Sequence, residues 1–381
     1  MTIPSVSLSV SGLRITARYA LSGPLEEAPS RAAAIALEQT IEFPADLVGD
    51  DDIRRHVMGR VESIEAAGPA LAIADLSYAV ETTGFELPQL LNVLFGNCSL
   101  LPGVRLVDVR FPPPFLARFR GPRFGIDGLR DLLGVPRRPL LATALKPMGL
   151  GSAALAQMAA TLARAGVDLI KDDHSLANQP FAVFAERVAA CAAAVADANA
   201  ATGRRALYLP SVNAPAGELE ARVALARSVG AGGLLVLPGL GGFDAMRWLA
   251  DDDGIALPIM AHPAFLGSFV AEERSGIEHG LLFGTLMRLA GADMTIFPSY
   301  GGRFSFSRAA CGSIASACRA SLGALAPILP VPAGGMTLDR LPELAAFYGQ
   351  DAVLLIGGDL HRGDLYENAL RMRDAAVQLA A

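Results

Sequence analysis

The amino-acid sequence predicts an α/β protein, a (β/α)8 TIM barrel preceded by a smaller N-terminal α+β domain of the ferredoxin-like type. Three observations support this prediction. The chain has 381 residues, more than one compact core of ordinary size holds. From residue 140 onward, eight short apolar runs alternate with helical patterns, as they do in a barrel. Before that point, the patterns follow the order β-α-β-β-α-β.

The N-terminal domain is expected to begin with a strand over residues 4–21, because Val6, Leu8 and Val10 alternate with serines. Ser30 is suited to cap a helix over residues 32–38. The remaining elements are predicted as strands around 60–64 and 70–80, a helix from 86 to about 95, and a strand over 104–111.

A proline run at 112–114 and the segment 121–134 indicate a connection between domains. We therefore expect the N-terminal domain over residues 1–125 and the barrel, as the catalytic domain, over residues 126–381. The barrel strands are predicted at 140–146, 169–173, 206–212, 233–237, 257–261, 293–297, 331–333 and 352–356. Alanine-rich helices are predicted between them, for example over 155–165, 180–200 and 218–229.

Composition excludes several classes of protein. Hydrophobic residues make up 52% of the chain and charged residues 18%, as in a large globular body. The net charge is −6 without a basic block, so no nucleic-acid partner is expected. No apolar run reaches the roughly 20 residues that span a membrane, and no signal-peptide pattern is present. The four cysteines form no CxxC pair, which favours buried thiols and a cytoplasmic location.

Active sites of (β/α)8 barrels lie at the carboxyl ends of the strands. This rule selects a set of candidate residues: Lys146, Lys171, Asp173, His174, Asn213, His262, Arg303, Gly334, Gly335, Gly357 and Gly358. The glycine pairs follow the seventh and eighth predicted strands, where such barrels bind phosphate with backbone N–H groups. Tight turns are the alternative for these pairs, a satisfied core histidine is the alternative for His262, and a flexible surface turn is the alternative for Arg303.

The stretch 166–174 brings a lysine, two carboxylates and an imidazole to the end of one apolar strand. Such clustering is costly unless the groups share a purpose. A hard cation such as Mg²⁺ would reduce the repulsion between the carboxylates, but it would repel the ammonium of Lys171. The lysine is therefore a salt-bridge partner, an acid or base, or a modified residue. The alternative is a strand-end salt bridge with an exposed histidine.

Two strings, Ala142–Pro147 and Lys171–His174 followed by Asn178–Phe181, resemble the large subunit of ribulose-bisphosphate carboxylase. The glycine pairs follow in the same order and spacing. The resemblance implies that CO₂ carbamylates Lys171, that the carbamate and Asp173 bind Mg²⁺, and that Lys146 handles protons during enolisation. It also implies a homodimer, in which Glu38 and Asn97 reach the active site of the partner subunit.

Several positions depart from the carboxylase pattern. His174 replaces the third metal-binding carboxylate, Met148 replaces a second lysine, and Arg303 replaces the lysine of the mobile loop. Pro263 and Ile296 replace cationic groups on the phosphate side. A bisphosphate needs compensating donors, so a bisphosphate substrate is disfavoured. The chain thus resembles a RuBisCO-like protein (form IV), and CO₂ fixation is not expected.

The resemblance implies a Mg²⁺-stabilised enediolate on a phosphorylated sugar or sugar acid. In this hypothesis the glycine pairs and Arg303 bind substrate, and Lys146 transfers a proton. His262 contacts a hydroxyl, and His174 is either a metal ligand or a second acid/base group. We rank decarboxylation of a 3-oxo sugar-acid phosphate, of the 3-oxo-isoapionate 4-phosphate type, first. The alternatives are an isomerase or enolase of a methylthio-ketose phosphate in methionine salvage, and a non-catalytic ligand-binding or regulatory homologue.

Overall fold

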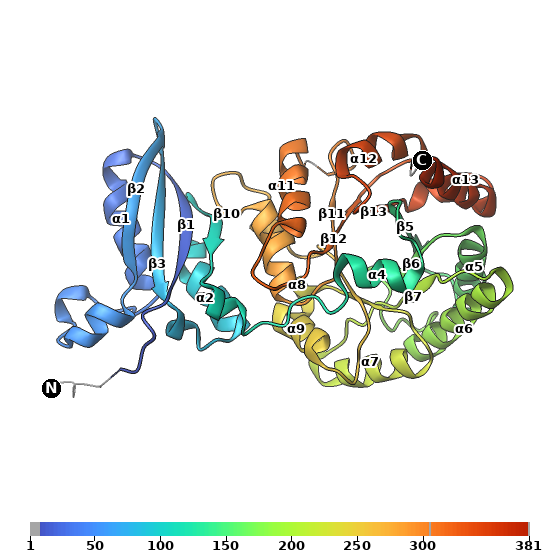
Figure 1. The fold of residues 1–381 in the computed structure, drawn as a ribbon, viewed down its shortest axis with the longest axis horizontal. Helices are drawn as coiled ribbons and strands as arrows, with labels where there is room; N and C mark the ends of the chain where they lie inside the picture. Colours follow the sequence, from blue (N-terminus) through green and yellow to red (C-terminus); the bar gives the residue numbers. More distant parts are fainter. Residues whose placement is uncertain (1–7, 305, 380–381) are drawn as a thin grey trace. The chain divides into compact units, whose positions relative to one another are not determined.

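The computed structural model describes residues 8–304 and 306–379 (Figure 1). The chain divides into two compact units. One comprises the chain up to Phe119 together with Leu266–Leu282, and the other comprises Arg120–Phe265 and the chain from Phe283 onward. The segment 266–282 folds with the first unit because its short strand pairs with β4 of that unit. Residue 125 lies shortly after the first of these divisions, and as a domain boundary it remains a proposal.

The first unit is built on a five-stranded sheet with the order β10-β4-β1-β3-β2. All neighbouring pairs are antiparallel except β10 with β4. The part formed by β4, β1, β3 and β2, with two intervening helices, has the ferredoxin-like order. The strands are β1 (Arg14–Ser22), β2 (Arg60–Gly68), β3 (Leu71–Ala79), β4 (Val104–Arg110) and β10 (Gly276–Ile277). The helices are α1 (Ala28–Glu38), α2 (Leu87–Phe95) and α3 (Pro113–Leu116).

Two details of the first unit differ from the prediction. The first strand begins at Arg14, because no sheet partner is present for residues 8–13, and residues 4–7 lie outside the described residues. Ser30 does not cap α1, since the helix begins at Ala28 and the Ser30 hydroxyl donates to the Glu27 carbonyl oxygen at 2.9 Å. The Ser30 side chain thus bonds back to the first turn, which residues of this type do when they lie inside a helix.

The second unit holds the predicted barrel of eight parallel strands. Hydrogen bonds link them in two groups, β12-β11-β9-β8 and β13-β5-β6-β7. An isolated bridge between Ser211 and Leu235 joins β7 to β8, and β12 lies beside β13, so the barrel closes. The strands are β5 (Leu140–Leu145), β6 (Leu169–Asp172), β7 (Leu207–Leu209), β8 (Leu234–Val236), β9 (Ile259–Ala261), β11 (Met294–Pro298), β12 (Leu329–Ala333) and β13 (Val353–Leu355).

Helices surround this barrel, as Figure 1 shows for α5, α6 and α13. The barrel interior is a packed apolar cluster with side chains from every strand, and Ile126, Leu129 and Leu133 of α4 extend it. The helices are α4 (Gly125–Leu133), α5 (Ser152–Ala165), α6 (Phe184–Thr202), α7 (Leu219–Ser228), α8 (Pro238–Gly241), α9 (Phe243–Asp251), α10 (Met287–Leu289), α11 (Arg308–Arg319), α12 (Leu341–Tyr348) and α13 (Leu365–Gln378). Among the described residues, no helix is long and apolar enough to cross a membrane.

Candidate active site

The alternation of side chains along the barrel strands places the candidate residues. Leu169 of β6 packs in the barrel interior, and successive side chains of a strand point to opposite faces. Lys171 and Asp173 therefore continue the inward side of β6 toward its carboxyl end. Met260 of β9 also packs in the barrel interior. His262 is two residues further along, just beyond the end of β9, and therefore lies on the same side. The period of two thus brings residues from separate strands to one end of the barrel.

Lys171 is almost completely buried, with 3% of its surface exposed. Its Nζ atom donates a hydrogen bond to the backbone oxygen of Asp172 at 3.0 Å. Burial lowers the pKa of the Lys171 amine to about 8, because the charged form loses its hydration. A substantial neutral fraction at near-neutral pH is what attack on CO₂ requires, since only the neutral amine is a nucleophile.

The carboxylate of Asp173 joins two proton-handling groups. Its Oδ2 atom accepts a hydrogen bond from Lys146 Nζ at 2.6 Å. Its Oδ1 atom accepts from the His174 backbone N–H at 2.9 Å and lies 3.0 Å from His174 Nδ1. Burial alone would raise the pKa of Asp173, but the hydrogen bonds from His174 and Lys146 outweigh it and hold the pKa well below its usual range. Asp173 is therefore ionised at any physiological pH.

His262 stacks on His174, with ring centroids 4.5 Å apart and ring planes 8° from parallel. Its Nδ1 atom accepts a hydrogen bond from the Ala264 backbone N–H at 3.2 Å. Burial first, and then the charges of Lys171 and His174, lower the pKa of His262 to about 2. The imidazole is therefore neutral, and because Nδ1 is an acceptor the proton resides on Nε2. His262 can donate a hydrogen bond to a substrate oxygen.

The alternative of a strand-end salt bridge with an exposed histidine also has support, because Lys146 pairs with Asp173 and the His174 side chain is 43% exposed. That alternative does not account for the burial of Lys171 or for the stacking of His262 on His174. Asn213 has a local role, since its Oδ1 accepts from the Leu237 N–H at 3.1 Å and its Nδ2 donates to Ser211 Oγ at 3.1 Å.

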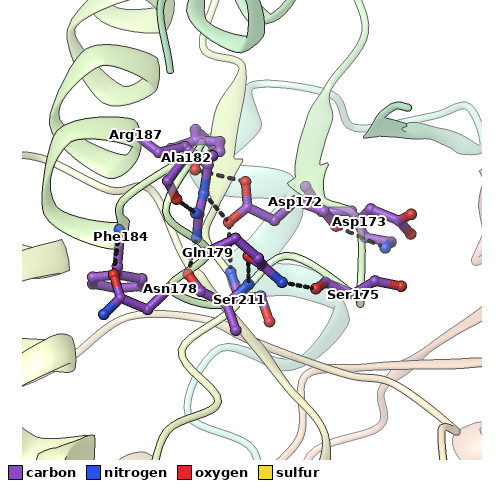
Figure 2. A network of polar contacts seen from close by, with 12 residues as sticks. Asp172, Asp173, Ser175, Asn178, Gln179, Ala182, Phe184, Arg187 and Ser211 are labelled. Atoms are coloured by element: carbon purple, nitrogen blue, oxygen red, sulfur yellow. Dashed lines mark hydrogen bonds and ion pairs between the residues drawn. The ribbon is translucent and has the colours of Figure 1, made fainter. Parts of the chain in front are cut away.

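Asp172, the other carboxylate of the stretch, points away from Asp173 toward Arg187 (Figure 2). Its Oδ2 atom lies 3.1 Å from Arg187 Nε and accepts from the Ser211 backbone N–H at 3.0 Å, and its Oδ1 accepts from the Tyr208 hydroxyl at 2.8 Å. Arg187 in turn donates to two carbonyl oxygens, those of Ala182 at 2.7 Å and Ala177 at 2.8 Å. This buried pair therefore fastens the loop after β6. The sequence analysis selected Asp173 as the site carboxylate and assigned no role to Asp172, and the period of two along β6 agrees with that choice.

The loop after β11 packs on the first glycine pair. The Arg303 N–H donates to the Gly334 carbonyl oxygen at 2.8 Å, and a Cβ on Gly335 would lie 2.8 Å from Arg303 Cγ. Gly334 and Gly335 have φ angles of 90° and 96°, which other residues rarely adopt. The structure therefore brings Arg303 and this pair together.

The second glycine pair lies beside Lys146. A Cβ on Gly357 would lie 3.8 Å from Lys146 Cε, whereas one on Gly358 would meet open space within 4 Å. The loops after β12 and β13 are tied together, because the Leu338 N–H donates to Asp359 Oδ2 at 3.0 Å. Two groupings therefore emerge, Arg303 with Gly334 and Gly335, and Lys146 with Gly357.

Glu38 and Asn97 meet within the first unit. Asn97 Nδ2 donates to Glu38 Oε1 at 2.8 Å, although 59 positions separate the two residues. The next residue of each segment explains this contact. Gln39 is buried, and its Nε2 donates to the carbonyl oxygens of Asn92 at 2.7 Å and Val93 at 3.1 Å, while its Oε1 accepts from the Cys98 N–H at 2.9 Å. Gln39, which the sequence did not single out, therefore holds the end of α1 against the end of α2.

The unmodified side chains do not form a complete metal site: within residues 8–304 and 306–379, no group of three His, Cys, Asp or Glu residues could hold a metal ion. Asp173 supplies one carboxylate, and a carbamate on the buried Lys171 would supply another. Oxygen donors of this kind suit Mg²⁺. The donor set therefore fits Mg²⁺ when Lys171 is carbamylated.

A second signal in the sequence selects the same two lysines that the barrel rule selects. Of the 32 lysine and arginine residues, only Lys146 and Lys171 are lysine. Arginine stays charged in nearly all surroundings, whereas a lysine amine can become neutral. Lysine thus occurs only at the carboxyl ends of β5 and β6, where a neutral amine has a chemical use.

Comparison with known proteins identifies the family to which the chain is similar. Residues 125–303 match the family described as ribulose bisphosphate carboxylase large chain, catalytic domain. A Rubisco-like protein of known structure from Rhodopseudomonas palustris superposes with a TM-score of 0.88 at 41% identity, over 97% of this chain and 99% of that one.

Two relatives carry names that state an activity. A 5-methylthioribulose-1-phosphate isomerase from Rhodospirillum rubrum is 39% identical over 349 residues, 91% of each chain. A 2,3-diketo-5-methylthiopentyl-1-phosphate enolase from Geobacillus kaustophilus is 36% identical over 346 residues, 87% of this chain and 84% of the relative. Taken with the barrel and its strand-end residues, these similarities show that the chain belongs to the RuBisCO-like proteins of the ribulose bisphosphate carboxylase large-chain family.

Proposed function

We propose that the protein is an isomerase of a methylthio-ketose phosphate, of the 5-methylthioribulose-1-phosphate type, working through an enediolate. The observation that supports this most directly is the position of Asp173, whose two oxygens contact Lys146 and His174. Moving a proton between neighbouring carbons needs groups that remove and return it, and this site holds two such groups side by side. The similarity to an isomerase and an enolase favours this alternative over decarboxylation of a 3-oxo sugar acid.

Lys171 as a carbamate and Asp173 are the residues that would hold Mg²⁺, and His174 is the alternative third ligand. When bound, the ion would supply Lewis-acid stabilisation of negative charge on the substrate oxygens. Because His174 is the softer ligand of the three, we keep acid/base chemistry as its main proposed role. Lys146, after its ammonium has passed a proton to solvent, would remove the proton from the carbon beside the carbonyl group as a neutral amine.

The substrate would be oriented by neutral donors and by the loops. His262 would donate its Nε2–H to a substrate oxygen, which it can do without changing its charge. Backbone N–H groups around Gly334, Gly335, Gly357 and Gly358 would bind one phosphate, and Arg303 would add a charge beside the first pair. In a homodimer, Glu38 and Asn97 would enter the site of the partner subunit.

The test follows the substrate by NMR in D₂O with Mg²⁺ and bicarbonate. Methylthioribulose 1-phosphate is expected to gain deuterium and change into an isomeric ketose phosphate. Lys146→Met should abolish both changes, and Arg274→Met, an exposed site in the first unit, should not.

Other outcomes of this experiment would support a different function. Turnover of the diketo phosphate alone would make it an enolase, and loss of CO₂ from a 3-oxo sugar-acid phosphate would restore decarboxylation. Binding of substrates without any exchange would contradict an enzymatic function and favour the ligand-binding alternative.

A further inference from the structure

His361 contains a buried polar atom that lacks a partner. The residue ends the short turn Gly358–His361 (η10), which follows β13. Its Nε2 atom is buried, and in the described part of the chain it has no hydrogen-bond partner. Buried polar atoms in folded proteins nearly always have a hydrogen-bond partner. An unpaired nitrogen after a barrel strand therefore indicates that its partner binds in another state of the site.

The turn is held firmly on both sides of this residue. Asn368 of α13 is buried, and its Nδ2 donates to the carbonyl oxygens of Leu360 and Arg362, each at 3.0 Å. Asp359, two residues earlier, accepts from the Leu338 backbone N–H at 3.0 Å. The unpaired Nε2 atom of His361 therefore lies in a turn whose backbone is held in place.

Lys146 is a cationic side chain that lies beside the start of this turn. Its Cε atom would lie 3.8 Å from a Cβ on Gly357, the residue that precedes the turn. After burial, the charge of Lys146 is the second cause that lowers the pKa of His361. An uncharged imidazole nitrogen near an ammonium group is a ready acceptor.

The contact between Asp173 and Lys146 has to change when a ligand binds to the Asp173 carboxylate. Its Oδ1 atom is engaged by His174, and its Oδ2 is engaged by Lys146. A ligand that takes Oδ2 of the carboxylate removes the acceptor of the ammonium, whose side chain is 34% exposed, and a nearby free imidazole nitrogen can then accept from it.

We propose that His361 is a positioning residue whose Nε2 accepts a hydrogen bond from Lys146 when Asp173 is engaged elsewhere. Lys146 would thus have two resting positions, one on Asp173 and one on His361. Its amine would move between them as the site fills. The catalytic consequence rests on the proposed proton transfer by Lys146, whereas the contact itself does not.

The first test needs no substrate. The sequence holds five histidines, so ¹⁵N-histidine NMR gives few signals, and His361→Gln identifies the signal of His361. Asp173→Ala removes the first acceptor, and the His361 Nε2 resonance should then shift as a nitrogen does when it accepts a hydrogen bond. In the double variant Asp173→Ala/Lys146→Met the shift should vanish. No shift in the single variant, or a shift that persists in the double variant, would overturn the proposal.

The second test separates positioning from substrate binding. His361→Leu should lower kcat about tenfold, the effect of one hydrogen bond, with KM almost unchanged. His361→Gln retains an acceptor oxygen and should recover most of the rate. Arg362→Leu, the exposed neighbour, serves as the control and should behave like the wild type.

A raised KM with unchanged kcat in His361→Leu would assign the residue to substrate binding and refute the proposal. If no substrate is turned over by the wild type, the NMR result still decides whether Lys146 and His361 make the contact.

Discussion

At the scale of single residues, the chemistry of the site depends on which side chains stay neutral. Burial brings the pKa of Lys171 to about 8 and that of His262 to about 2. The first group can therefore lose its proton near physiological pH, and the second hardly ever gains one. Asp173 keeps its negative charge at every physiological pH, so it can attract a cation, whether Lys146 or a metal ion.

Carbamylation of Lys171 can be observed directly because the chain has only two lysines. With ¹³C-bicarbonate and Mg²⁺ we expect one lysine carbamate resonance, distinct from that of the α-amino group. It should be lost in Lys171→Met and retained in Lys146→Met. Because CO₂ reacts with the neutral amine and burial sets the pKa of Lys171 to about 8, the signal should grow between about pH 7 and about pH 9. A resonance that survives Lys171→Met would show that another amine reacts.

His262 should stay neutral in acid. Its folded-state pKa lies below the ordinary value near 6.5, so as the pH falls below that value the unfolded chain binds a proton that the folded chain does not. Stability contributed by this residue is therefore present above about pH 6.5 and decreases toward about pH 5. ¹⁵N-histidine NMR should show the neutral Nε2–H form at about pH 5, and His262→Asn should flatten the loss of stability. A charged ring at that pH would contradict this assignment.

At the scale of elements, β6 serves two purposes through its alternating faces. Its inward side chains, Leu169 and Lys171, lead from the barrel core to the site, while Asp172 points outward into the network with Arg187. The outward network fixes the loop that follows Asp173. The geometry of the site therefore depends on a buried ion pair that takes no part in the chemistry.

Arg187→Met should test this dependence. It would leave the Asp172 carboxylate buried without its cation, and breaking a buried pair in this way costs about 3–5 kcal/mol. The same change at Arg227, on the exposed surface of α7, should cost less than about 0.5 kcal/mol. Urea unfolding measures both. Equal, small effects would indicate that the loop is held by other contacts.

Gln39 should affect activity through Glu38 and Asn97. Replacing it with leucine leaves the Val93 carbonyl oxygen and the Cys98 N–H without this partner, while the Asn92 carbonyl oxygen keeps only the Gly96 N–H, so the two segments would separate. We expect kcat to fall by about tenfold in Gln39→Leu. Little further loss should follow when Asn97→Ala is added, because the pair is already disrupted. Gln157→Leu on α5 is the control, and additive losses would show that Gln39 acts independently of the pair.

At the scale of the whole molecule, the sequence predicted the number, order and type of the barrel strands, because buried parallel strands are continuous apolar runs. It also predicted the strand-end position of Lys146, Lys171 and His262, which follows from the barrel rule. It could not reveal the hydrogen bonds of Gln39 and Arg187, because the folded backbone brings their partners into place, nor the unpaired nitrogen of His361. The start of β1 was missed since alternation continues beyond the paired residues.

Mixing two inactive variants tests the proposed exchange between subunits. Glu38→Ala damages the first unit, and Lys146→Met damages the second. If Glu38 acts in the site of the partner, a mixed dimer has one intact site, and random mixing should restore roughly a quarter of the wild-type rate. Mixing Lys146→Met with Lys171→Met is the control and should restore nothing, because both changes lie in the same unit. No recovery in the first mixture would mean that Glu38 acts within its own chain or not at all.

The scarcity of lysine has a consequence for chemical labelling. Acylating reagents that attack amines meet two side-chain targets in this sequence, and Lys171 is almost inaccessible. Lys146, whose side chain is 34% exposed, is then the one lysine such a reagent can reach. A fluorescent ester would therefore mark the end of the barrel, besides the α-amino group of the chain, and leave the arginine side chains unmodified. Protection of that one position would report ligand binding before any substrate of the protein is known.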